Sequence, residues 1–198
     1  MKAKSIAHEL RNHAPFTAFG TATGLVIMAV IIQVRLPREM SSVLFWTFHP
    51  LHVLLSALVT AAMYRLHGGG SVWRTLLIGY FGSVGIATLS DSLIPYAGEW
   101  LLDLPHKGLH LGLIEKWWLV SPLALAGTAL AYVRPKTKFP HAGHVLLSTW
   151  ASLFHVTMAL GTDITVSTAI LVAAFLFLAV WVPCCTSDII LPLLFSKE

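Results

Sequence analysis

The stretch HPLHVLLS at residues 49–56 recurs as HAGHVLLS at residues 141–148, and six of the eight positions are identical. A second polar motif, Ser-Asp, follows each copy, beginning 41 residues after the first histidine at positions 90–91 and 46 residues after it at positions 187–188. Leucine and valine match easily between hydrophobic segments, whereas two polar motifs that recur in the same order are harder to obtain by chance. The sequence therefore predicts an internal duplication.

The composition indicates that both copies lie in a membrane. Of the 198 residues, 56% are hydrophobic and 11% are charged, whereas soluble domains carry roughly 25% charged residues. A bilayer is crossed by about 20 consecutive apolar residues in a helix. Stretches of about that length or longer occur at residues 14–36, 43–66, 72–96, 117–133, 140–161 and 165–195. The sequence predicts an all-α integral membrane protein, a single domain over residues 1–198 with about six transmembrane helices.

The predicted spans divide evenly between the two halves. Residues 14–96 form repeat 1 and residues 117–195 form repeat 2, with three spans in each. An odd number of spans reverses the direction of the chain, so the two three-helix repeats are predicted to be inverted about an axis in the membrane plane. Inverted repeats with interrupted helices are a recurring plan of secondary transporters.

Lysine and arginine are distributed unequally between the two predicted sides. Nine of the 13 fall on the side that receives both chain ends, and four fall on the other side. Because positive residues accumulate in the cytoplasm, both termini are predicted to be cytoplasmic. Residues 1–13 then form a cytoplasmic interfacial segment, and residues 97–116 form an external loop. The net charge of +4 follows from this topology, and we expect no nucleic-acid partner.

A metal site is predicted in the outer half of the membrane. His49 and His52 lie three residues apart, which places both imidazoles on one helix face. Asp91 ends the next span on the same side, and His155 of the fifth span also faces the outer half. Ionisable groups inside a membrane are costly and usually functional, although histidines that only bond neighbouring helices remain an alternative. Two imidazoles and a carboxylate suit zinc, iron or manganese.

The duplication predicts a matching site in the inner half. His141, His144 and Asp188 repeat the outer set, and Cys184 and Cys185 precede the aspartate by about one helical turn. Thiolates at this position would favour softer ions. The alternative for the cysteines is a structural role as small buried residues, and for the aspartates a helix cap or an interhelical hydrogen bond.

Three functions remain open from the sequence. The first is a small membrane transporter for a divalent transition-metal ion, which uses paired His/His/Asp sites. The second is a membrane-embedded metalloenzyme acting on lipid or peptide. The third is a haem b electron carrier, in which His141 with His155, and His52 with His67, are spaced to hold two haems. The expected partners are membrane lipid and the metal ion, and a homo-oligomer is left open.

Overall fold

The computed structural model describes residues 2–135, 138–160, 165–185 and 190–195. Within these ranges the chain is all-α, with 86% helix and no strand. The longer helices are α1 (Lys2–Val34), α2 (Arg38–Leu66), α3 (Val72–Thr88), α6 (Trp117–Val133), α7 (Lys138–Ala159) and α8 (Val166–Cys185). The shorter ones are η1 (Leu89–Leu93), α4 (Ile94–Leu101), α5 (Gly112–Glu115) and α9 (Leu191–Phe195).

Four helical segments of the described residues are long and apolar enough to cross a bilayer. They are Ala14–Val34, Arg38–Leu66, Val72–Leu101 and Ser167–Cys184. The prediction of a membrane protein is supported by these segments, but the count of six spans is not confirmed. Helix α6 is apolar but has only 17 residues. Helix α7 has 22 residues, and its polar side chains lower its hydropathy.

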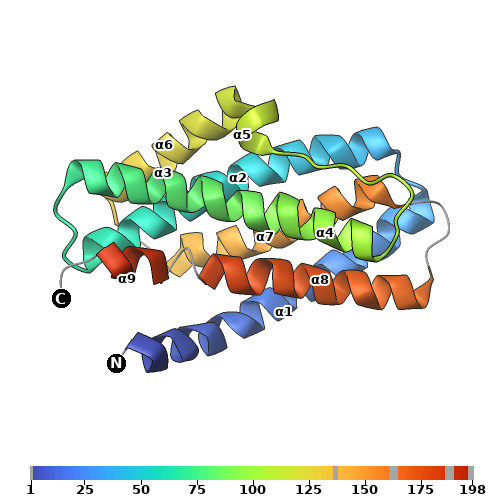
Figure 1. Cartoon of the computed structure of the whole chain (residues 1–198), viewed down its shortest axis with the longest axis horizontal. Coiled ribbons are helices and arrows are strands. Elements are labelled where there is room, and N and C mark those ends of the chain that lie inside the picture. The colour runs from blue at the N-terminus through green and yellow to red at the C-terminus, as the bar shows by residue number, and fades with distance from the viewer. Residues whose placement is uncertain (1, 136–137, 161–164, 186–189, 196–198) are drawn as a thin grey trace.

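Helix α7 lies inside the bundle rather than on its surface. It packs against α2, α1 and α8, and α2 in turn packs against α3 and α6 (Figure 1). Every residue from Ala151 to Ala159 is buried. A helical segment that is buried on all sides is surrounded by protein, so Ser152 and His155 in this part of α7 face other helices. The core between α1, α7 and α8 contains Met28, Leu153, Val156, Val172 and Leu176.

Helices α3, η1 and α4 form one continuous rod. The segment from Leu89 to Leu93 is a turn of π-helix, which carries the Ser90-Asp91-Ser92 sequence. Turns of this kind are rare and often mark functional sites in proteins. Pro95 lies at the start of α4 and has no N–H to donate, but the helical rod continues through it. The third predicted span therefore continues to Leu101, and residues 97–101 are helical rather than part of a loop.

The segment between α4 and α6 folds back over the N-terminal half of α2 (Figure 1). It approaches closely enough that a β-carbon on Gly112 would overlap Nε2 of His49. Residues 102–116 therefore cover the end of the polar interior at His49, in addition to linking two helices.

Glycines permit the close contacts of α6 with α2 and α3. A β-carbon at Gly127 of α6 would overlap the carbonyl oxygen of Leu54, and one at Gly79 of α3 would overlap the side chain of Thr128. Small residues at such crossings allow helix backbones to approach in membranes. The N-terminal residues 2–13, predicted as a separate interfacial segment, are continuous with the first span in α1.

Candidate metal centre

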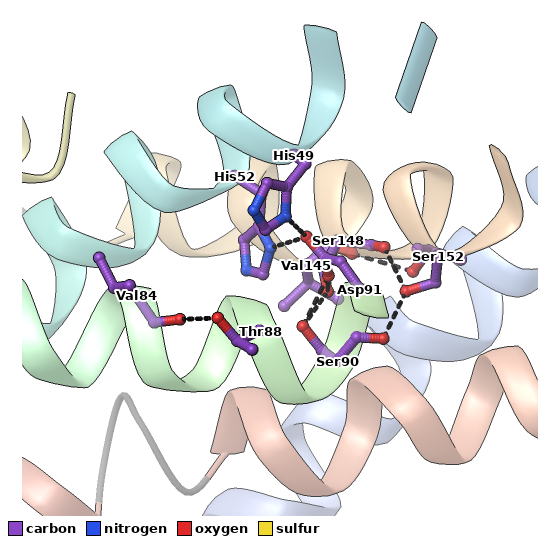
Figure 2. A network of polar contacts seen from close by, with 10 residues as sticks. His49, His52, Val84, Thr88, Ser90, Asp91, Val145, Ser148 and Ser152 are labelled. Carbon is purple, nitrogen blue, oxygen red and sulfur yellow. Dashed lines mark hydrogen bonds and ion pairs between the residues drawn. The ribbon is translucent and has the colours of Figure 1, made fainter. Parts of the chain in front are cut away.

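Asp91 joins the two histidines of α2. Its Oδ2 lies 2.9 Å from Nδ1 of His49 and 2.7 Å from Nδ1 of His52, and all three side chains are buried (Figure 2). An ionised carboxylate only accepts hydrogen bonds, so each imidazole donates from Nδ1. The lone pair of each histidine is then on Nε2, the atom that is available to a metal ion.

Serines from two elements hold the other oxygen of Asp91. The hydroxyls of Ser90 and Ser148 donate to Oδ1 at 2.6 Å and 2.9 Å. The hydroxyl of Ser152 in α7 is shared between the carbonyl oxygens of Ser148, at 2.8 Å, and of Ser90, at 2.9 Å, and the second contact joins the π-helical turn to α7 (Figure 2). Asp91 thus accepts four hydrogen bonds from the protein. The sequence predicted that Asp91 is a metal ligand. Its four hydrogen bonds favour a different role, in which Asp91 orients the two histidines.

Three buried residues from three helices come together beside this network. One ligand atom each of His52 in α2, His144 in α7 and Cys184 in α8 lies within 4.8 Å of the others. The ring centroids of His52 and His144 are 5.6 Å apart. Nε2 of His52 is buried and has no hydrogen-bond partner among the described residues, which is costly unless a ligand compensates.

This donor set fits a transition metal. Zinc binds nitrogen at about 2.0–2.1 Å and sulfur at about 2.3 Å, which places tetrahedral ligand atoms roughly 3.3–3.6 Å apart. Small side-chain rotations would bring the three atoms to these separations. Two imidazoles and a thiolate favour zinc, then iron, and they suit manganese poorly. An imidazole whose second nitrogen donates to a carboxylate, as in His52 and Asp91, is the usual arrangement at metal sites.

The central cluster combines residues that the sequence assigned to two separate sites. His52 was predicted to belong to the outer set, and His144 and Cys184 to the inner set. They meet because α2 and α7 pack along each other, so the repeated histidine motifs face one another across a single interface. His141 lies at the edge of the cluster, its ring centroid 5.1 Å from that of His144. The side chain of Cys185 and the whole of Asp188 lie outside the described residues.

His155 belongs to a different group from the one predicted. Its Nδ1 lies 2.8 Å from Oε1 of Glu99, and its ring neighbours are Phe45 and His110. The predicted contact with His49, His52 and Asp91 is replaced by this pairing, because Phe45 lies between His155 and His49.

The residues predicted for haem have other surroundings. His52 is buried between Asp91 and His144, whereas His67 is exposed at the end of α2 and donates to the carbonyl of Met63 at 2.8 Å. The haem b interpretation stays a prediction that a visible spectrum tests.

The sequence did not single out Glu99, Ser148 or Ser152. Glu99 was assigned to the external loop because it follows the apolar run, although a lone carboxylate beside such a run is itself a signal. Ser148 ends the repeated motif, where matches of leucine and valine arise easily between hydrophobic segments and give the serine no weight of its own. No protein-family model, no curated protein and no solved structure matches this chain.

Proposed function

We propose that the protein is a small membrane transporter for a divalent transition-metal ion, with zinc as the preferred cargo. The observation that carries the proposal is the buried donor set of His52, His144 and Cys184, with Nε2 of His52 lacking a partner among the described residues. Ionisable groups inside membrane bundles are expensive and usually serve a substrate or ion pathway.

The charges around the cluster match a dication. A metal-bound Cys184 is a thiolate, and Asp91 is the acceptor of four hydrogen bonds. Together they supply two negative charges close to the ion. A buried charge is tolerated when it is paired, so the pair offsets a divalent ion and leaves a monovalent ion overcompensated.

The polar interior extends beyond the central cluster in both directions. His141 lies beside His144 on one side, and Asp91 bridges His52 to His49 on the other. Each imidazole would replace part of the water shell of the ion. A row of such groups supports passage along the bundle, in addition to static binding.

The six spans and the inverted repeat belong to this proposal. In Figure 1, α2 and α7, which carry the matching histidine motifs, run in opposite directions. The start of α1 and helix α9 lie at the same end of the bundle in that view. Both features agree with two inverted three-helix repeats and with both termini in the cytoplasm.

A membrane-embedded metalloenzyme acting on lipid or peptide is the second candidate. It is favoured by the concentration of three ligands in one place, which leaves a fourth position open as in catalytic zinc sites. Against it, two cavities formed by described residues, one lined by Arg35 and Asp103 and the other by Arg74 and Phe195, contain no residue of the cluster in their lining.

Zinc flux into proteoliposomes separates these functions. We expect saturable uptake by the wild type, and loss of uptake in His52→Ala and in Cys184→Ser. His67→Ala is the matched control, because His67 is an exposed histidine of the same helix. Bound zinc without flux would contradict the transporter and favour the enzyme. A haem absorbance band in the purified protein would contradict both.

A further inference from the structure

A second carboxylate–imidazole pair lies away from the central cluster. Glu99 at the end of α4 is 1% exposed and His155 of α7 is 0% exposed. Oε1 of Glu99 accepts from Nδ1 of His155 at 2.8 Å, and Oε2 accepts from the backbone N–H of Gly108 at 3.0 Å. Both carboxylate oxygens are therefore engaged, and the imidazole is fixed with its lone pair on Nε2.

The second ring nitrogen of His155, Nε2, is buried and makes no hydrogen bond with the described residues. The arrangement repeats that of Asp91 and His52, in which a carboxylate holds Nδ1 and leaves a buried Nε2 without a partner. A buried nitrogen without a hydrogen-bond partner destabilises the fold unless a ligand compensates, so this nitrogen points to a ligand.

A second imidazole, that of His110, lies next to His155. It comes from residues 102–116, the segment that folds back over α2. The centroid of His110 lies 5.5 Å from that of His155. His110 is half-buried, and its Nδ1 lies 3.5 Å from Oε2 of Glu115. Each imidazole thus has a carboxylate next to its Nδ1, which leaves the lone pair on Nε2.

We infer that His155 and His110 form a second binding station for a divalent transition-metal ion, at the loop-covered end of the bundle. Two imidazoles suit zinc, iron, nickel and copper, and water would complete the coordination shell. Glu99 is a positioning residue, because it acts through His155. The inference rests on the proposed function for the choice of ion and for the station's place on its route.

Phe45 keeps this station separate from the central network. Its ring is fully buried, stacks on His49 with centroids 5.3 Å apart, and meets His155 edge-on at 5.4 Å. An apolar ring between two groups of imidazoles offers no ligand to an ion. The two sites are therefore expected to fill and to empty independently.

Cobalt(II) titration of the purified full-length protein tests the station. The central cluster contains a thiolate and the station contains none. Only the central cobalt should give a sulfur-to-metal charge-transfer band, and the wild type should bind two equivalents. His155→Ala and His110→Ala should each lose one equivalent and keep that band. His155 is fully buried, so His155→Ala could fail to fold. His110 is half-buried in a loop, so His110→Ala tests the same site in a protein that is expected to fold. Glu99→Gln should weaken the same equivalent by about 10–100-fold, because its amide oxygen can serve only one of the two donors.

His106→Ala and Glu39→Gln are the matched controls, because both side chains are exposed and neither belongs to the two proposed sites. The inference is overturned if His110→Ala binds as many equivalents of cobalt as the wild type does. Two bound equivalents without zinc flux would refute the transporter and leave the station standing. Absence of the charge-transfer band, with one equivalent lost in His110→Ala, would refute the central cluster alone.

Discussion

Asp91 is a buried residue that links three elements of the bundle through hydrogen bonds. Its two oxygens accept from two imidazoles and two hydroxyls that belong to α2, η1 and α7. A carboxylate that receives an imidazole N–H raises the basicity of the other ring nitrogen and fixes its direction. The hydrogen bond from Nδ1 of His52 to Asp91 therefore fixes the orientation of the His52 ring beside His144 and Cys184.

Asp91→Asn should weaken zinc binding while the protein stays folded. The amide oxygen can still accept from the histidines and the amide nitrogen can donate to the serine hydroxyls, so the contacts survive and the negative charge is lost. We expect affinity to fall by about 10–100-fold, measured by competition with a chelating dye.

Asp103→Asn is the matched control for that change. Asp103 is 93% exposed and pairs with Lys107, whose hydrogen bond lowers the pKa of the Asp103 carboxyl. Asp103 is exposed and does not belong to the cluster, so Asp103→Asn should bind zinc like the wild type. Equal affinity in Asp91→Asn and in the wild type would remove Asp91 from the site.

Zinc binding should strengthen as the pH rises. The ion competes with protons for the thiol of Cys184 and for the imidazoles, because ligands must be deprotonated. Affinity measured from pH 6 to pH 8 should increase, and the slope should fall by about one proton in Cys184→Ser. A slope that is the same in both proteins would mean that the thiol is not a ligand.

At the scale of the elements, the apolar runs predicted most helices, whereas the positions of the polar groups across the bundle were not predictable. Hydropathy gives the depth of a residue in the membrane but not which helix lies beside it. His52 and His144 were therefore assigned to opposite halves, although the packing of α2 on α7 brings them together. The π-helical turn at Asp91 has no hydrophobic periodicity to reveal it.

The crossing of α2 and α6 depends on Gly127. Gly127→Ala would place a β-carbon against the carbonyl oxygen of Leu54, and overpacking of this kind costs about 1–3 kcal/mol. We expect a lower midpoint of thermal unfolding in detergent. Gly85→Ala in α3 is the control, since no atom lies within 4 Å of the added carbon, and its midpoint should not fall. Equal midpoints in both variants would mean that the backbones of α2 and α6 leave room for a β-carbon at position 127.

At the scale of the whole molecule, the topology remains a prediction from the charge count. In a protein lacking Cys184 and Cys185, single cysteines at Gly70 and Lys107 should differ in intact cells. An impermeant thiol reagent should label position 107 and leave position 70 unlabelled until the membrane is opened. A β-carbon at position 70 has no atom within 4 Å, so protection there reports its side of the membrane. Labelling of position 70 from outside would reverse the orientation.

The central claim is that His52, His144 and Cys184 bind one metal ion inside the bundle. X-ray absorption at the zinc edge of the purified, zinc-loaded protein tests it most directly. The account predicts one sulfur at about 2.3 Å together with nitrogen at about 2.0–2.1 Å, and loss of the sulfur shell in Cys184→Ser. A wild-type spectrum with only nitrogen and oxygen neighbours would contradict it.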